Sequence, residues 1–184
     1  MNRTNMTTTC VLAAMILAAA LAGCSAGPMQ VAGAEASLPA KETSPGFLDR
    51  ISAGPNVSEN DAMRGLIMLL DGRDAAETFR QRINALLGRD VLDSTWDYDS
   101  ARPITRGKLA YMIYQACEIP GGVMLTLTGP SQRYCLRELQ YQGMMATGSQ
   151  AGAVTGMEFV AVLNRADTYM RTGRVPEIIS AGQE

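Results

Sequence analysis

The sequence predicts an all-α fold: a small, repeat-built helical domain that follows a signal-like segment and a flexible linker. Two observations lead to this prediction. Three apolar stripes of helical period each begin behind a Ser or Thr residue, at offsets of 47 residues (57 to 104) and 50 residues (104 to 154). Two further apolar segments between them end at glycine. The expected parts are a leader over 1–23, a linker over 24–46 and the helical domain over 47–184.

The first element is an export signal. After Arg3, an apolar stretch runs over Val11–Leu21, which is shorter than the roughly 20 residues of a spanning helix. The run that ends at Cys24 (Leu-Ala-Gly-Cys) resembles the lipobox of bacterial lipoproteins. The resemblance implies that Cys24 is acylated and anchors the chain in a membrane, and Ser25 after it implies the periplasmic side of the outer membrane. An ordinary secretory signal or a transmembrane anchor are the alternatives.

Composition defines the next segment and limits the chemistry. Residues 25–46 are rich in Ala, Gly, Ser and Pro without periodicity, which indicates a flexible spacer. The net charge is −2 with no long basic run, so no nucleic-acid partner is expected. The chain has no histidine, which removes the usual general base and zinc ligand. We therefore expect no enzyme, no catalytic residues, no metal and no cofactor; a hydrolase that uses carboxylates alone is the remaining catalytic class.

Two cysteines belong to the helical domain. Cys10 lies in the signal and Cys24 is the expected lipid site, which leaves Cys117 and Cys135. In an oxidising periplasm they can form a disulfide, and two buried free thiols are the alternative. Because no histidine can activate either thiol, neither is expected to be a nucleophile.

Each of the three stripes marks one buried face of a helix with its own N-cap. Ser58, Thr105 and Thr155 precede the stripes, where a hydroxyl can accept from the first-turn N–H groups. Asp61 and Glu158 also stand at capping-box spacing, as in Ser-x-x-Asp and Thr-x-x-Glu. The stripes follow i, i+3, i+4, i+7 spacing: Ala62, Gly65, Leu66, Leu69; Leu109, Met112, Ile113, Ala116; and Phe159, Val162, Leu163, Ala166.

A second class of helix is expected between the capped ones, over about 75–88 and 131–142. Each ends at a glycine, Gly88 or Gly143, which supplies a positive φ. An apolar pair then follows, Val91-Leu92 in one copy and Met144-Met145 in the other. The repeating unit is therefore a helix, an apolar pair, a loop and a capped helix.

This layout resembles the S-layer homology (SLH) repeat, in which a Gly-Ile/Val-type pair ends one helix and an ITRxE-like motif opens the next. Gly143-Met144-Met145 matches the first element, and Ile104–Lys108 (ITRGK) and Val154–Glu158 (VTGME) match the second. The resemblance covers roughly residues 57–170, as a half copy and two fuller ones. The middle copy has Lys108 where the family prefers Glu, the last lacks the Arg, and the first has neither Thr nor Arg.

The SLH resemblance implies a groove for anionic cell-wall polysaccharide between the lobes of a three-fold arrangement. Thr105 and Arg106 carry over together, Thr155 occupies the Thr position of the last copy, and Trp96 is a candidate sugar-stacking side chain. A guanidinium can bind a carboxylate through two hydrogen bonds. The alternative is that Arg106 is a solvated first-turn charge and Trp96 belongs to the core.

Two loops have their own alternatives. Asp93, Asp97 and Asp99 indicate a solvated polar loop; a calcium site is the alternative, but the EF-hand spacing is missing. The apolar, β-prone segment 123–128 is expected to be a short strand or a packed crossover loop, or else an exposed docking edge.

The expected function is that of a non-catalytic, lipid-anchored envelope protein whose repeats bind peptidoglycan or another envelope polysaccharide. The alternative is a structural lipoprotein that docks a protein partner in an envelope complex. In both cases the membrane is a partner through Cys24.

Overall fold

The computed structural model describes residues 44–175. The predicted leader, Cys10, Cys24 and most of the predicted linker lie outside the described residues. Within 44–175 the chain forms seven helices and no strand, which confirms an all-α fold for this part. The helices are α1 (Ser44–Ser52), α2 (Glu59–Asp71), α3 (Phe79–Leu87), α4 (Arg106–Ala116), α5 (Val123–Thr128), α6 (Gln132–Tyr141) and α7 (Gly156–Thr172).

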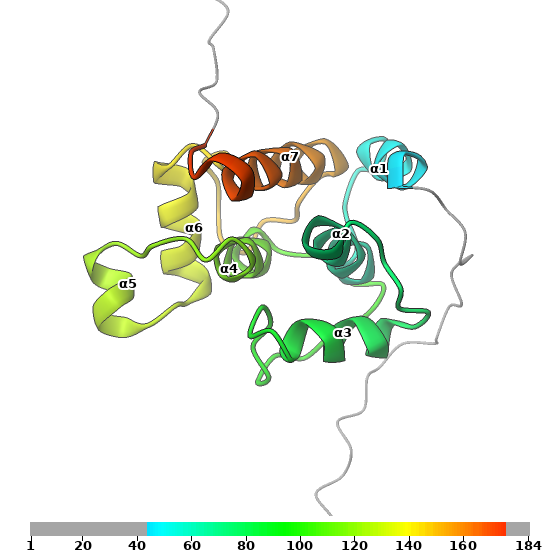
Figure 1. Ribbon diagram of the computed structural model, residues 1–184, viewed down its shortest axis with the longest axis horizontal. Coiled ribbons are helices and arrows are strands. Elements are labelled where there is room, and N and C mark those ends of the chain that lie inside the picture. The colour runs from blue at the N-terminus through cyan, green and yellow to red at the C-terminus, as the bar shows by residue number, and fades with distance from the viewer. Residues whose placement is uncertain (1–43, 176–184) are drawn as a thin grey trace, which may run out of the picture. The chain divides into compact units, whose positions relative to one another are not determined.

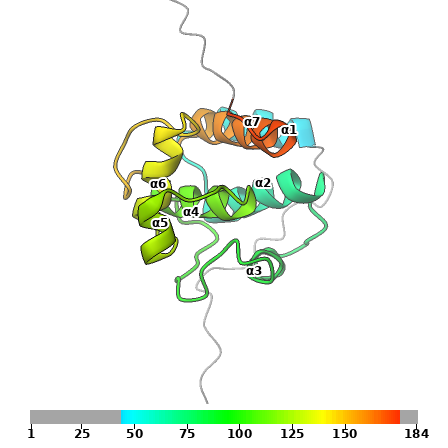
Figure 2. The same ribbon diagram turned by 60° about the vertical axis from the view of Figure 1, so that its left-hand side comes forward.

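Helix α2 is the centre of the packing. It contacts α3, α4 and α7, while α1 lies on α7, and α6 lies between α4 and α5. Figures 1 and 2 show α1 and α7 together on one side of α2 and α4, with α3 on the opposite side. Across 44–175, none of the helices combines the length and the apolar character that crossing a bilayer requires.

The three predicted N-caps are confirmed. Each capping hydroxyl has extended backbone and accepts a hydrogen bond from the N–H three residues ahead. The donors are Asp61 to Ser58 (3.1 Å), Lys108 to Thr105 (3.3 Å) and Glu158 to Thr155 (3.3 Å). Short polar side chains at these points therefore start α2, α4 and α7 where the sequence predicted.

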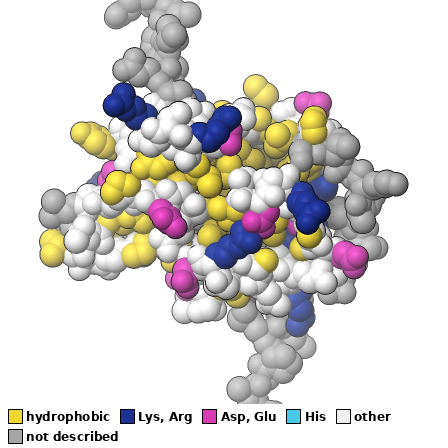
Figure 3. All heavy atoms as spheres, in the orientation of Figure 1, with side chains coloured by type: hydrophobic (Ala, Val, Ile, Leu, Met, Phe, Trp, Pro, Cys, Tyr) yellow, Lys and Arg dark blue, Asp and Glu magenta, His cyan; other side chains and the backbone are white. Residues whose placement is uncertain are grey.

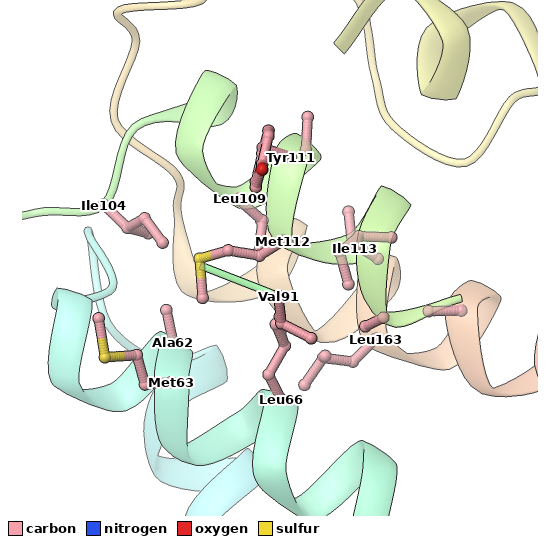
Figure 4. Close-up of a cluster of buried hydrophobic side chains, with 14 of the residues drawn as sticks. Ala62, Met63, Leu66, Val91, Ile104, Leu109, Tyr111, Met112, Ile113 and Leu163 are labelled. Carbon is pink, nitrogen blue, oxygen red and sulfur yellow. The ribbon is translucent and has the colours of Figure 1, made fainter. Parts of the chain in front are cut away.

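The predicted stripes form the core. All of their residues are buried except Leu69, which is partly buried. Figure 4 shows Leu66 of α2, Met112 and Ile113 of α4 and Leu163 of α7 converging on Val91 from the loop after α3. The apolar pairs Val91-Leu92 and Met144-Met145 are also buried, each beside its own helix end. The helical period of the sequence thus selected the correct face of each capped helix.

Helix α3 differs from its prediction at both ends. It begins at Phe79 rather than near residue 75, because Thr78 and Gln81 form a reciprocal capping box there. At the other end Gly88 has φ −64°, and the positive φ falls on Asp90 (56°) instead. Helix α3 therefore ends at Leu87, beside the predicted glycine, but the left-handed residue follows two positions later than predicted. In contrast, Gly143 after α6 has φ 75°, as expected.

The segment 123–128 was predicted as a strand or crossover loop, and both predictions are wrong because it forms the short helix α5. Leu125 is buried whereas Leu127 is 76% exposed, and in a strand the two side chains would point to the same face. Gly129 ends the helix with φ 78° and donates its N–H to Leu125 O at 2.9 Å. Helical packing of one side chain overrides the β propensity of the segment.

Helix α1 was not predicted. It begins at Ser44, inside the segment expected to be linker, and buries Phe47 and Ile51 one turn apart. These two side chains belong to the same core as the stripes. The described fold therefore starts before the expected boundary at residue 47.

Candidate functional site

The starts of α2, α4 and α7 meet in a closed ring of backbone hydrogen bonds. Ile104 donates its N–H to Val57 O (2.8 Å), Val57 donates to Val154 O (2.9 Å), and Val154 donates to Ile104 O (3.1 Å). Each residue gives one bond and accepts one, and all three side chains are buried. These are the β-branched residues that precede the three N-caps. We call this group the backbone ring, and the three places where neighbouring helix starts meet its junctions.

At the first junction, α2 meets α4 through a nearly buried ion pair. Lys108 Nζ lies 2.6 Å from Glu59 Oε1, and the Glu59 side chain is only 2% exposed. The other carboxylate oxygen accepts from the N–H of Asp99 at 3.0 Å. The N–H of Glu59 donates to Arg102 O at 2.8 Å. This dense pairing satisfies both oxygens of a carboxylate that water hardly reaches.

At the second junction, α4 meets α7 through a bidentate pair. Arg106 Nε and Nη2 each donate to one oxygen of Glu158 at 2.8 Å. The hydrogen bonds to Glu158 raise the already high pKa of the Arg106 guanidinium. The N–H of Arg106 donates to Gly152 O at 2.8 Å. The fork that was expected to bind a ligand carboxylate therefore binds a carboxylate of the protein itself.

At the third junction, α7 meets the chain before α2 by close backbone approach. Gly156 donates its N–H to Gly54 O at 3.1 Å. A Cβ at this position would lie 1.7 Å from Ile51 O, so only glycine fits. The acid of the first capped helix, Asp61, pairs with Arg50 from α1 at 3.5 Å.

Trp96 lies partly buried against the first junction. Its ring contacts Tyr111 edge-on, with 5.0 Å between centroids, and lies near Tyr98 at 6.3 Å. Lys108 Nζ is 5.6 Å from the Trp96 ring centroid, within range of a cation–π interaction. Burial raises the pKa of the Tyr98 hydroxyl, which donates to Asp93 O at 2.6 Å. Trp96 thus packs in an aromatic cluster with Tyr98 and Tyr111.

The four residues expected to bind a ligand have contacts of their own within the fold. Thr105 and Thr155 serve as N-caps of different helices, Arg106 is bound by Glu158, and Trp96 belongs to the first junction. Thr155 is exposed, while Thr105, Arg106 and Trp96 are partly buried. What the structure brings together instead is each capped start with the next one.

Cys117 and Cys135 are free, buried thiols in the structure. Cys117 caps the end of α4 and Cys135 lies in the first turn of α6. Burial raises the pKa of Cys117 to about 12 and that of Cys135 to about 11. Both thiols therefore stay protonated at neutral pH, which makes them poor nucleophiles.

The aspartates of the loop after α3 bind within the protein. Asp93 accepts from the N–H and hydroxyl of Thr95, and Asp99 accepts from Ala101 N–H at 2.9 Å. Asp97 pairs with Arg102 at 2.8 Å, and this hydrogen bond lowers the pKa of Asp97. Within residues 44–175, no group of three or more Cys, Asp or Glu residues could hold a metal ion.

A buried polar cluster between α2 and α3 was not predicted from the sequence. Arg82 donates to Asp74 (2.7 Å), to Asn60 Oδ1 (3.0 Å) and to Ala76 O (2.8 Å), and its side chain is 5% exposed. The signal was present, because Arg82 occupies position i+3 in the apolar stripe that begins at Phe79. A charged residue inside a buried stripe requires partners, and here they hold the loop before α3.

Comparison with known proteins adds no family. No protein-family model, no curated protein and no solved structure matches the chain.

Proposed function

We propose that the chain is a lipid-anchored envelope protein whose SLH-like repeats form a three-lobed, non-catalytic module that binds peptidoglycan or another envelope polysaccharide. Cys24 would carry the lipid, on the periplasmic side of the outer membrane, and residues 24–46 would span the distance to the wall. The proposal combines two kinds of support: the lipobox-like run in the sequence, and the arrangement of the three capped helices.

The backbone ring is the observation that carries the proposal. Val57, Ile104 and Val154 are the equivalent residues of the three SLH-like motifs, and each donates to another member of the same set. Three sequence-equivalent points joined head to tail are what repeated units produce when they pack around a common axis. This supports three lobes of the kind the SLH resemblance implies.

The ion pairs support the same equivalence. In each ion pair, one residue lies two positions after a ring residue and the other lies four positions after the next ring residue. The pairs are Glu59 with Lys108 and Arg106 with Glu158. The ITRxE-like motif has Arg at the position of Glu59 and Glu at the position of Lys108. Both residues therefore carry the charge opposite to that of the motif. The two departures compensate, so the middle copy retains the pairing with reversed polarity.

Retention on purified sacculi tests the binding proposal. The full chain is mixed with insoluble peptidoglycan and, as a control, with neutral cross-linked dextran beads, and both are sedimented. We expect the protein to sediment with sacculi and to stay in solution with dextran. Protein that remains in the supernatant in both cases would overturn the proposal.

Fractionation tests the anchor separately. The wild-type chain is expected in the outer-membrane fraction and to incorporate labelled palmitate, whereas Cys24→Ala is expected to lose both properties. A matched Cys10→Ala variant is expected to behave like wild type. Equal palmitate incorporation by Cys24→Ala would exclude Cys24 as the lipid site.

A second candidate function, docking of an envelope protein, is favoured by one observation. The side chains expected to contact sugar, Arg106 and Trp96, already have partners inside the fold. If docking is the function, cross-linking in cells recovers one specific envelope protein and sacculi retain nothing.

A further inference from the structure

Two exposed arginines of α6, Arg133 and Arg137, make no side-chain hydrogen bond or salt bridge within the described part of the chain. They stand one turn apart, where like charges destabilise a helix. Most of the other arginines of this region do have partners, such as Arg82 and Arg106. This pair is therefore a local excess of positive charge.

The two arginines border a hollow between α6 and the loop that leads to α7. The hollow has a volume of about 240 Å³ and is lined by Arg133, Leu136, Arg137, Gln140, Gly148 and Gln150. Figure 2 shows the loop passing beside α6. The volume is below the roughly 300 Å³ at which cofactor and drug sites begin, so the hollow suits one small acidic unit rather than a cofactor.

The loop wall of the hollow is fixed by the second junction. Gln140 Nε2 donates to Ala146 O at 3.1 Å and to Gly148 O at 3.3 Å. Behind Gly148 lies the guanidinium of Arg106, because a Cβ on Gly148 would meet Arg106 Nη1 at 2.1 Å. Glu158 holds that guanidinium in place. A wall that is already ordered loses little conformational entropy when a ligand binds.

Tyr141 continues the row of exposed residues. It stands one turn beyond Arg137 on α6 and is 89% exposed, so Arg133, Arg137 and Tyr141 lie at successive i+4 positions, about 6 Å apart along the axis. Figure 3 shows that on the face it presents, charged side chains of both signs are interspersed with apolar ones, without a broad basic patch.

We propose that this hollow binds the acidic group of a sugar unit, a carboxylate or phosphate, in an envelope polysaccharide. The guanidinium groups of Arg133 and Arg137 match such an anion. The side-chain oxygen of Gln140, whose amide nitrogen already donates to the loop, and the amide of Gln150 suit hydroxyl groups. The Tyr141 ring offers a flat face to the next sugar. Two arginines are fewer than the four to eight basic residues that bind an anionic membrane surface. The inference rests on the proposed polysaccharide-binding function and names the site for it.

Titration with a defined acidic oligosaccharide tests the site. Tetragalacturonate is added to the ¹⁵N-labelled full chain, and we expect amide shifts confined to α6 and residues 146–150. Arg133→Gln/Arg137→Gln is expected to weaken binding at least tenfold. The matched control is Arg73→Gln/Arg80→Gln, which removes the same charge from two exposed arginines around the start of α3. It is expected to change the dissociation constant less than twofold.

The other possible outcomes show whether the hollow or the wall-binding function is wrong. An equal loss in both double variants, or shifts elsewhere in the chain, would overturn the site, as would binding to phosphatidylglycerol vesicles without binding to tetragalacturonate. If sacculi retain wild type and Arg133→Gln/Arg137→Gln equally, the proposed function stands and the hollow is wrong. If tetragalacturonate binds at α6 but sacculi retain nothing, the hollow stands and the wall-binding function is wrong.

Discussion

The first and second junctions of the backbone ring each join two helix starts by an ion pair, but the acidic and basic residues exchange positions between them. In both, a residue in the first turn of one capped helix pairs with a residue in the first turn of the next. At the first junction the acid comes from α2 and the base from α4; at the second the base comes from α4 and the acid from α7. The difference teaches that the position of the pair, rather than the residue type, is what the packing of these helices requires.

The two pairs also differ in their access to water. The Glu59 and Lys108 side chains are 2% and 14% exposed, whereas Arg106 and Glu158 are 23% and 11% exposed. Since an uncompensated charge costs more free energy the less water reaches it, we expect the first junction to be the more sensitive one. Among residues 44–175, no salt bridge joins α2 to α7 at the third junction, where the backbones approach closely at Gly156.

The largest effect is expected at Gly156 in the third junction, where the neighbouring backbone leaves no space for a side chain. Gly156→Ala places a methyl group 1.7 Å from Ile51 O, a contact that only backbone movement can relieve. We expect the free energy of unfolding in urea to fall by about 3 kcal/mol or more. Gly88→Ala is the matched control, because its Cβ would lie 3.4 Å from the nearest atom and its φ is −64°. Similar stability of the two variants would contradict a closed third junction.

The second-largest effect is expected from substitutions that exchange the charges of the ion pair at the first junction. Glu59→Arg puts two cations together in a nearly buried place and should lower the free energy of unfolding by about 3 kcal/mol. Adding Lys108→Glu recreates the polarity of the second junction and also completes the capping-box spacing after Thr105. We expect the double variant to recover more than half of the loss.

Recovery should remain incomplete because the surroundings differ. The carboxylate of Glu59 also accepts from Asp99 N–H, and Lys108 lies near the faces of Trp96 and Tyr98, where a carboxylate is unfavourable. A double-mutant cycle in urea, with Lys108→Glu alone as its fourth corner, measures the coupling. Losses that simply add would mean that the two residues do not act as one pair.

How far the sequence could predict this fold follows from the range of the interactions. Ser58, Thr105 and Thr155 were recognisable as caps because the donor lies three residues away in the same helix. The period of the stripes likewise selected the buried faces. The partner of Arg106, in contrast, is 52 residues distant, and no local pattern reports it. From the sequence alone, Arg106 was therefore interpreted as a ligand-binding candidate or a solvated charge.

The same reasoning explains the two misjudged helices. Segment 123–128 has β-prone residues, and the burial of Leu125 in the core, which favours a helix there, cannot be recognised from the local sequence. Helix α1 offers just three large apolar residues, Phe47, Leu48 and Ile51, after a polar stretch, which is too short a pattern to separate from linker. In the site, Arg133 and Arg137 read as ordinary surface charges until the loop beside them forms the hollow.

A smaller effect is expected at the second junction. Arg106→Ala removes two charge-assisted hydrogen bonds, but water can reach the remaining Glu158 carboxylate in part, so the free energy of unfolding should fall by about 1.5 kcal/mol. Arg106→Lys keeps the charge without the fork and should recover less than half of that loss. If Arg106→Ala proves more destabilising than Glu59→Arg, the ranking of the two junctions by water access is wrong.

The smallest effect concerns the loop that borders the first junction. The hydrogen bond from Arg102 lowers the pKa of Asp97 below its ordinary 3.8 in the folded protein. The stabilisation from this pair is therefore present above about pH 3.8 and disappears as the pH falls through the lower, folded-state value. An NMR titration of the Asp97 side-chain carboxyl should give a midpoint below 3.8 that returns toward 3.8 in Arg102→Gln. Because Asp97 is exposed, the change in unfolding free energy should be slight even though the midpoint moves. The titration therefore reports the geometry of the loop independently of stability, and an unshifted midpoint would show that Arg102 does not bind the Asp97 carboxylate.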